Sequence, residues 1–379
     1  MKLIHLSDLH IGKKLNGYSM LEDQKYILNQ ILDIVKTVSP DGIIIAGDIY
    51  DKSVPPSEAV TEFDDFLYAL SEMDKPIFII SGNHDSAERL SFGSRIMSDK
   101  KIYISPVYNG NITPVECEDE YGSVFFYLLP FIKPNDVKKR FPDAPFNGSN
   151  YSDAVRFAVE QMNIDPSERN VIVTHQFVKG ASKSDSEEPC SVGGTDEVAA
   201  DIFDVFDYTA LGHIHGPQNI GKPNIRYCGT PLKYSFSEEK HKKSVTVVDI
   251  REKGVTEVST IDLNPLRDMR TVEGEFAEVR KISNYTADYV RVILTNSEPV
   301  HDAFQFLRET YPNIMILKNG TNSSENTIEA FKDDQLEKRS PLDIVAEFLT
   351  VKGVEMTDMR KNYLEKIISE IWEGKNETD

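Results

Sequence analysis

The sequence predicts an α/β protein in which two mixed β-sheets are sandwiched between helices, followed by a small α/β second domain and a C-terminal helical tail. Three observations favour this fold class. Short apolar runs alternate with helical patterns over the first two thirds of the chain, as layered α/β architectures require. This alternation breaks at Asn264-Pro265. Helical spacing of apolar residues then returns near the end of the chain.

The strands and helices of the first part follow from apolar spacing. Two stretches, residues 21–38 and 57–73, show the spacing of amphipathic helices. Five runs predict strands buried on both faces: residues 3–6, 43–46, 76–80, 171–173 and 208–211. Three later runs resemble antiparallel additions: residues 124–129, 225–228 and 245–250. The sheets are therefore predicted to be mixed.

Three domains are predicted: residues 1–264, residues 265–330 and residues 331–379. In the second, residues 289–294 and 313–317 are strand-like and residues 301–311 are helical, whereas the polar residues 318–327 indicate a loop or linker. In the third, Ser340-Pro341 supplies the N-cap and first-turn proline of a helix. A later helix carries one apolar stripe, formed by Leu364, Ile367, Ile368 and Ile371.

Composition limits the possible partners and locations. The 42 Lys and Arg against 62 Asp and Glu give a net charge of -20, which excludes passive adhesion to nucleic acid through bulk electrostatics. Either bound divalent cations and a basic partner offset this acidity, or the substrate is not a polymer. Asp8 comes too early for a signal peptide, and no run approaches the roughly 20 uncharged residues of a membrane span. Cys117, Cys190 and Cys228 are too scattered for a disulfide framework, so a reducing, cytoplasmic location is expected.

Five of the predicted strands end in polar clusters, which hold five of the eight histidines. The clusters are Asp8-Leu9-His10, Gly47-Asp48, Gly82-Asn83-His84-Asp85, His175 and Gly212-His213-Ile214-His215. Each alone is more often a turn or a core histidine. Ligands of open α/β sheets collect at the carboxyl ends of the strands, so their joint occurrence predicts one site. If the first strand stays extended, Asp8 and His10 project to the same side.

The donor types indicate a two-metal centre. Carboxylate, imidazole and amide oxygen donors together suit Mn²⁺, Fe²⁺ or Zn²⁺ better than Ca²⁺. Seven donors fill two sites only if one of them bridges, which a carboxylate does best, at a spacing of about 3.5 to 4 Å. Such a pair lowers the pKa of a bound water toward about 7 and clamps the attacking and leaving oxygens of a displacement at phosphorus.

In this order, the clusters resemble the calcineurin-like metallophosphoesterase superfamily. Longer motifs resemble the SbcD family, the nuclease subunits of bacterial SbcCD complexes. They are Asp8-Leu9-His10-Ile11-Gly12-Lys13, Gly47-Asp48-Ile49-Tyr50-Asp51, Val192-Gly193-Gly194, the run from Gly229-Thr230-Pro231 to Ser237, and Ser340-Pro341-Leu342. The resemblance spans most of the chain and is dense up to about Asp249.

The resemblance implies roles for individual residues. One cation is held by Asp8, His10 and His215, a second by Asn83, His175 and His213, and Asp48 bridges the two; Mn²⁺ is the expected ion. His84 contacts the scissile phosphate or protonates the leaving oxygen, and Asp85 orients its ring. Archaeal and eukaryotic relatives have a catalytic histidine at the position of Asp51, which makes Asp51 a secondary candidate for a catalytic-site role.

The resemblance also implies a function and partners. The expected activity is a manganese-dependent hydrolase, a duplex-end exonuclease and hairpin endonuclease, coupled to an SbcC-type coiled-coil ATPase in DNA repair, recombination and replication. A homodimer within a heterotetramer is expected, built by the helices that follow residues 47–48 and 82–85. The second domain would cap DNA. The stripe from Leu364 to Ile371, with Trp372, either docks on the ATPase or packs within its own domain.

Three further possibilities stand beside this interpretation. Lys240, Lys242 and Lys243 could contact phosphates, although a solvated charged face is the favoured interpretation. A phosphodiesterase or phosphatase for small molecules or phosphoproteins fits the clusters, but it does not explain the chain beyond Pro265. A non-catalytic scaffold would show degenerate ligand positions, whereas here every position carries a competent donor.

Overall fold

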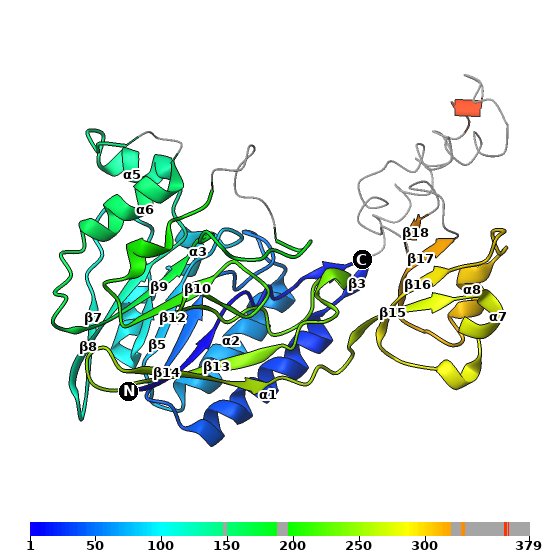
Figure 1. Ribbon diagram of the computed structural model, residues 1–379, viewed down its shortest axis with the longest axis horizontal. Helices are drawn as coiled ribbons and strands as arrows, with labels where there is room; N and C mark the ends of the chain where they lie inside the picture. The colour runs from blue at the N-terminus through cyan, green and yellow to red at the C-terminus, as the bar shows by residue number, and fades with distance from the viewer. Residues whose placement is uncertain (147–149, 188–195, 320–326, 330–359, 362, 364–379) are drawn as a thin grey trace.

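The computed structural model describes residues 1–379 apart from residues 147–149, 188–195, 320–326, 330–359, 362 and 364–379. Two six-stranded sheets lie face to face with helices on their outer sides, and a four-stranded sheet lies beyond one end of them (Figure 1). The predicted α/β class with two mixed, helix-covered sheets is confirmed. The tail helices with Ser340, Leu364, Ile367, Ile368, Ile371 and Trp372 lie outside the described residues.

The first sheet has the order β14-β13-β1-β4-β5-β6. Its strands are β1 (Lys2–Leu6), β4 (Gly42–Ala46), β5 (Ile77–Ile80), β6 (Ile102–Ile104), β13 (Ser244–Ile250) and β14 (Thr256–Asp262). Strands β1, β4, β5 and β6 are parallel to one another, and β13 runs antiparallel to both β1 and β14. The carboxyl ends of four strands therefore share one edge.

The second sheet has the order β11-β12-β10-β9-β8-β7. Its strands are β7 (Val115–Asp119), β8 (Gly122–Leu129), β9 (Arg169–His175), β10 (Tyr208–Gly212), β11 (Gln218–Ile220) and β12 (Lys222–Tyr227). Of the three runs predicted to be antiparallel additions, which correspond to β8, β12 and β13, only β13 is antiparallel to both of its neighbours. Strands β8 and β12 are parallel to their inner neighbours, and only the edge strands β7 and β11 run antiparallel. Apolar spacing specifies which faces are buried and carries no information on strand direction.

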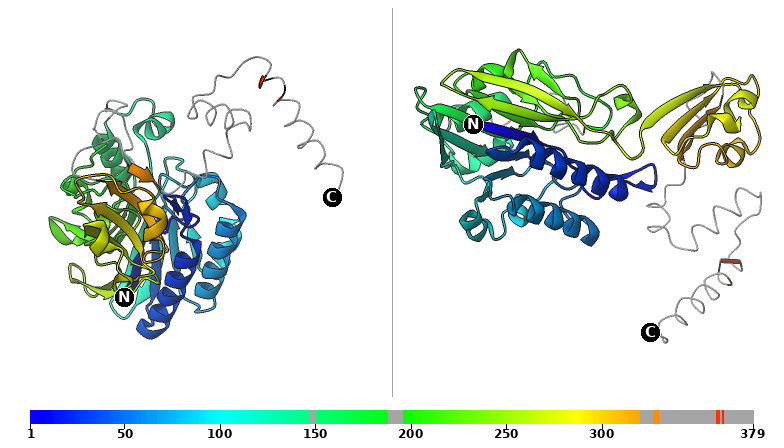
Figure 2. Two further views of the ribbon diagram at one scale, coloured as in Figure 1. Left: turned by 90° about the vertical axis from the view of Figure 1, so that its right-hand side faces the viewer. Right: turned by 90° about the horizontal axis from the view of Figure 1, so that it is seen from below.

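Helices cover the outer faces of both sheets (Figure 2). Helices α1 (Leu21–Val38) and α2 (Ser57–Ser71) pack on the first sheet, and α6 (Tyr151–Glu160) packs on the second. Between the sheets, the rings of Phe78 and Phe126 stack with centroids 4.0 Å apart. The remaining short elements are α3 (Ala87–Leu90), α4 (Ser94–Met97), α5 (Pro134–Arg140), β2 (Lys14–Leu15), β3 (Tyr18–Ser19), and the 3-10 turns Ser98–Lys100, Ala200–Phe203, Phe236–Glu238 and Ile282–Asn284.

The third sheet follows the Asn264-Pro265 break. It contains β15 (Met269–Gly274), β16 (Tyr289–Leu294), β17 (Ile314–Asn319) and β18 (Thr327–Glu329), with α7 (Phe276–Val279) and α8 (Ala303–Leu307) on one face. The helix predicted over residues 301–311 is thus shorter than expected. The loop predicted over residues 318–327 contributes its two ends to β17 and β18. The division into three domains remains a prediction.

The third sheet contacts the start of α1. The hydroxyl of Tyr289 donates to the carboxylate of Asp23 over 2.6 Å, and Arg267 donates to the same carboxylate over 2.7 Å. The hydroxyl of Tyr18 donates to the backbone oxygen of Ile314 over 3.1 Å. These polar contacts fix the sheet against the helix that begins just beyond the first polar cluster.

Candidate metal centre

The structure brings all seven predicted donors together at one edge of the two sheets. They follow the carboxyl ends of β1, β4, β5, β9 and β10, and comprise Asp8, His10, Asp48, Asn83, His175, His213 and His215. All are buried except Asn83, which is partly exposed. The centre lies where the two sheets meet, because β4 and β5 belong to the first sheet and β9 and β10 to the second.

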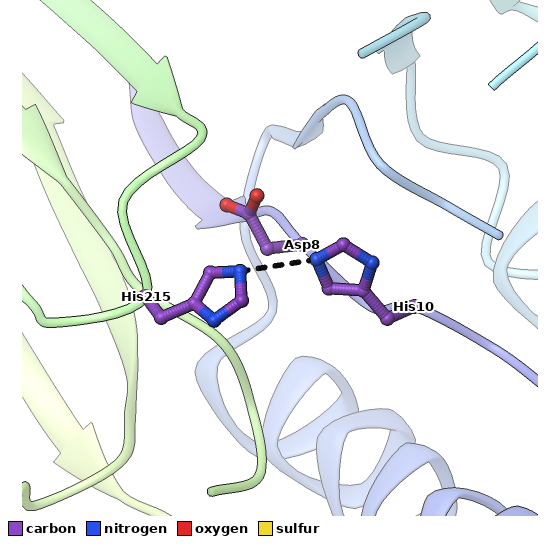
Figure 3. A group of neighbouring side chains, drawn as sticks. All are labelled: Asp8, His10 and His215. Atoms are coloured by element: carbon purple, nitrogen blue, oxygen red, sulfur yellow. Dashed lines mark hydrogen bonds between the residues drawn. The ribbon is translucent and has the colours of Figure 1, made fainter. Parts of the chain in front are cut away.

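One group of donors consists of Asp8, His10 and His215. The Nε2 atoms of His10 and His215 lie 3.1 Å apart, and the Asp8 carboxylate lies beside both rings (Figure 3). The backbone N–H of His213 donates to Asp8 over 3.0 Å, and the Ser7 hydroxyl donates to the same carboxylate. Asp8 is therefore held in place from the second sheet.

The second group consists of Asn83, His175 and His213. The amide oxygen of Asn83 lies 3.1 Å from His175 Nε2 and 2.9 Å from His213 Nδ1. His175 Nδ1 donates to the backbone oxygen of Ala46 over 2.7 Å. That hydrogen bond fixes the tautomer and leaves Nε2 as the donor atom for a cation.

Asp48 lies between the two groups. Its Oδ2 atom is 3.2 Å from His175 Nε2 and 3.8 Å from His10 Nε2. Its Oδ1 atom accepts the backbone N–H of His84 over 2.9 Å. A carboxylate oxygen that faces a histidine of each group has the position that a bridging ligand requires.

The spacing of these donors fits a pair of divalent cations. Around an ion with octahedral bonds of about 2.1 Å, neighbouring donor atoms lie about 3.0 Å apart. Here the close donor pairs within each group lie 2.9 to 3.1 Å apart. Three sets of side chains offer ligand atoms that all lie within 4.8 Å of one another: Asp8 with His10 and His215, His10 with Asp48 and His84, and Asp8 with Asp48 and His175.

Unusual backbone conformations direct several of the donors. Asp8, His10, Asp48 and His213 have φ angles of 53°, 46°, 50° and 101°, which side-chain-bearing residues seldom adopt. Such conformations cost on the order of 1–3 kcal/mol each and cluster at functional sites. The expectation of an extended backbone through Asp8 and His10 is therefore wrong, because β1 ends at Leu6.

A glycine lets the two sheets approach at the centre. A Cβ atom at Gly212 would collide with the backbone oxygen of Ala46 and lie 2.5 Å from His175 Nδ1. Gly212 pairs with His175 in the register of β10 and β9. The hydrogen bond that fixes the His175 tautomer therefore depends on the absence of a side chain at position 212.

Burial and the carboxylates set the proton affinities. Burial lowers the pKa of His175, but Asp48 and Asp8 outweigh it and raise that pKa to about 9. Burial raises the pKa of Asp8 to about 6. Burial alone would raise the pKa of Asp48, yet His175 and His10 hold it well below its usual range. The cluster thus attracts positive charge.

We expect cation affinity to rise with pH. In the cation-free protein His175 carries a proton below about pH 9, and Asp8 carries one below about pH 6. A cation displaces these protons, so affinity should increase about tenfold for each pH unit per proton released and level off above about pH 9. Calorimetric titration with Mn²⁺ in buffers of different ionisation enthalpy measures the protons released. An affinity that does not change across this range would contradict the assignment.

His84 lies beside the donors, and its contacts differ from the expected ones. Its Nδ1 atom contacts the backbone oxygen of Asp51 at 2.9 Å, and its Nε2 atom lies 4.0 Å from Asp48 Oδ2. Asp85 instead accepts the backbone N–H groups of Ile49, Tyr50 and Gly82. The prediction that Asp85 orients the His84 ring is therefore revised. The Asp51 carbonyl takes that place, while Asp85 holds the loops after β4 and β5 together.

The Asp51 side chain points toward Lys13 and His10. Its Oδ1 atom is 2.6 Å from Lys13 Nζ and 3.9 Å from His10 Nδ1. The His10 backbone is held separately, because Gln24 Nε2 donates to its carbonyl oxygen over 2.7 Å and Gly12 N–H donates to Gln24 Oε1 over 2.9 Å. Asp51 therefore lies near the ring of a predicted ligand without a hydrogen bond to it, because its carboxylate is bonded to Lys13.

Sequence analysis missed a buried ion pair behind His215. Glu238 and Lys243 are both buried, with their charged atoms 2.5 Å apart. Lys243 Nζ donates to the backbone oxygen of His215 over 2.9 Å, and Glu238 Oε1 lies 3.4 Å from His215 Nδ1. Ser186 Oγ bonds to both His215 Nδ1, at 2.6 Å, and Glu238. Glu238 directly follows the Gly229 to Ser237 motif, a signal that was present in the sequence.

Glu238→Gln is expected to lower affinity for the cation that His215 is predicted to hold about 10- to 100-fold, because it removes the carboxylate behind that imidazole. Titration calorimetry with Mn²⁺ measures the effect. Glu239→Gln is the matched control, since the neighbouring Glu239 accepts hydrogen bonds from Thr271. Equal cation affinity in the two variants would contradict a supporting role for Glu238.

The three lysines considered as phosphate contacts differ in their exposure. Lys240 and Lys242 are exposed, in accord with a solvated face, but Lys243 is buried in the ion pair with Glu238. Lys243 therefore has no place in a phosphate-binding surface. The Val192-Gly193-Gly194 motif and Cys190 lie outside the described residues.

Comparisons with known proteins define the family. Residues 1–217 match the family model of the calcineurin-like phosphoesterases, and residues 265–352 match a model described as type 5 capsule protein repressor C-terminal domain. A Staphylococcus epidermidis protein named as an SbcCD nuclease subunit is 35% identical over 92% of this chain and 92% of its own length. The chain belongs to the SbcD family of calcineurin-like phosphoesterases.

Further relatives extend the SbcD match. A Staphylococcus saprophyticus protein of the same name is 33% identical over 98% of this chain and 99% of its own length. Among solved structures, a dimetal phosphatase from Danio rerio covers 70% of this chain and 99% of its own, at 13% identity and a TM-score of 0.37. None of the described helices has the length and apolar character of a bilayer-spanning segment.

Proposed function

We propose that this chain is the nuclease subunit of an SbcCD-type complex and hydrolyses phosphodiester bonds in DNA at the metal centre. The convergence of seven donors on one space, with His84 beside them, carries the proposal. The nearly full-length similarity to proteins named as SbcCD nuclease subunits favours DNA over a small molecule or a phosphoprotein as the substrate.

Each residue of the centre has a role in this proposal. Asp8, His10 and His215 hold one cation, Asn83, His175 and His213 hold the other, and Asp48 bridges them. We favour Mn²⁺, because the donors mix carboxylate, imidazole and amide oxygen. When bound, such a pair lowers the pKa of the attacking water and neutralises charge on the phosphate.

His84 supplies the proton for the leaving group in this proposal. The Asp51 carbonyl holds its Nδ1 proton, so Nε2 faces the space beside Asp48. From there a protonated ring can contact the scissile phosphate and donate to the departing oxygen. Asp85 contributes by holding together the loops that carry Asp48 and His84.

The proposal includes the assembly. An SbcC-type ATPase binds residues 331–379, two copies pair through the region of α2 to α4, and the complex acts on duplex ends and hairpins in the cytoplasm. Exposed apolar side chains support the pairing surface: Val60 and Tyr68 lie on α2, and Phe92 and Ile96, at 84% and 76% exposure, lie in and beside α4. Residues 265–330 form the domain that caps DNA.

The purified chain tests this function. With Mn²⁺ it should cleave linear duplex and hairpin DNA, should be inactive with a chelator, and should change its substrate preference when the ATPase is added. A bis-aryl phosphodiester serves as the small-molecule comparison. Efficient hydrolysis of that compound without any cleavage of DNA would favour the small-molecule phosphodiesterase.

A further inference from the structure

A groove of about 700 Å³ leads from the metal centre to helix α5. We call it the α5 groove and define it by Asn83, Phe131, Lys133, Lys139 and Arg140, which all line it. Asn83 is also a predicted cation ligand. The ring of Phe131 lies 6.4 Å from the ring of His175, and its backbone N–H donates to Ser81 over 2.9 Å. One predicted donor, Asn83, therefore forms part of the groove wall, and Phe131 contacts a second, His175.

The positively charged side chains of the groove are available to a ligand. Lys133, Lys139 and Arg140 are exposed, in a protein whose net charge is -20. Within the described part of the chain, neither Lys133 nor Arg140 forms an ion pair with a carboxylate, and Lys139 meets Asp136 only at 3.8 Å. Such a local concentration of positive charge meets the condition that DNA contact in this acidic chain must be local.

The acidic side chains that line the groove have partners of their own. Asp136 accepts the backbone N–H of Lys133 over 3.0 Å, which caps α5. Glu88 accepts from the Ser86 hydroxyl over 3.0 Å. Asp85 is committed to three backbone N–H groups. These contacts orient the carboxylates without removing their charge, so the excess of positive charge in the groove is confined to α5 and the residue before it, where Lys133, Lys139 and Arg140 stand against Asp136.

We propose that the α5 groove binds the DNA strand that continues from the scissile phosphate, in single-stranded form. Lys133, Lys139 and Arg140 contact its phosphates, and Phe131 stacks on a base. This inference rests on the proposed nuclease function. A basic groove beside an aromatic side chain is the arrangement that binds single strands. Inside a duplex the base faces are covered by stacking, so a duplex would offer Phe131 only the face of its terminal base pair.

The triple variant Lys133→Gln/Lys139→Gln/Arg140→Gln tests the phosphate contacts. Its control is Lys36→Gln/Lys101→Gln/Lys222→Gln, which makes the same charge change at exposed, ion-paired lysines that do not line the groove. Binding of a single-stranded oligonucleotide with hydrolysis-resistant linkages is measured against salt concentration. The slope of log affinity against log salt should become shallower by about 2 in the groove variant, at about 0.7 per phosphate contact. The control should retain the wild-type slope.

Phe131→Ala tests the stacking contact and should weaken oligonucleotide binding at least about fivefold. Phe131→Tyr keeps an aromatic face and should retain oligonucleotide binding. Cation affinity is measured for both variants, because it reports any disturbance of the neighbouring His175. If wild type cleaves DNA while the groove variant binds like the control, this inference is wrong. If wild type does not cleave DNA, the proposed function itself fails.

Discussion

His84→Ala should reduce DNA hydrolysis at least about 100-fold while both cations remain bound, since general acid catalysis contributes about 10²- to 10⁴-fold. The side chain lies beside Asp48 and has its Nδ1 occupied by the Asp51 carbonyl. Removing the ring therefore removes a proton donor and leaves the seven predicted ligands in place. Cleavage of duplex DNA with Mn²⁺ and metal content by elemental analysis are measured together.

The geometry makes this experiment decisive about the role of His84. His10, Asp48 and His84 offer ligand atoms within 4.8 Å of one another, so the ring also stands within reach of a cation. Loss of a cation from the His84→Ala protein would make the residue a ligand and contradict its assignment as an acid. His301→Ala, at an exposed position beyond the nuclease sheets, is the matched control and should retain both metal content and activity.

Asp48→Ala should lose both cations and all nuclease activity. One oxygen of Asp48 faces a histidine of each donor group, at 3.2 Å and 3.8 Å, so its removal deprives both sites of a ligand. It also removes the negative charge that raises the pKa of His175. Metal content is measured after dialysis against Mn²⁺. Asp33→Ala, an exposed aspartate of α1, controls for loss of a carboxylate. Retention of one cation by the Asp48→Ala protein would refute bridging.

The donor set could be predicted from the sequence because it depends on residue type and on position after a strand. Parallel strands bring their carboxyl ends to a common edge, so Asp8, Asp48 and Asn83 gather at the edge of the first sheet, and His175 and His213 at the edge of the second. The boundaries of α1 were equally accessible, since its apolar spacing is regular from its first residue to its last.

What the sequence could not supply are contacts made through the backbone and across the sheets. Asp85 follows His84 in the sequence, which suggested a hydrogen bond between the two side chains. In the structure its carboxylate instead accepts three backbone N–H groups. The ion pair of Glu238 and Lys243 reaches His215 only after the second sheet has formed. The left-handed turns at Asp8 and His10 depend on interactions with the loops after β4, since the N–H groups of both residues donate to backbone oxygens of Gly47 and Asp48.

Two neighbouring residues in the first turn of α1 connect it to different parts of the molecule. Asp23 receives the hydrogen bonds of Tyr289 and Arg267 from the third sheet, and Gln24 grips the backbone of His10 and Gly12. Asp23 and Gln24 are consecutive residues, so a single peptide bond links the two sets of hydrogen bonds. A movement of the third sheet that displaces Asp23 would therefore also displace Gln24 and the loop that carries His10. Displacement of the third sheet would thus reach a residue that is predicted to hold a cation.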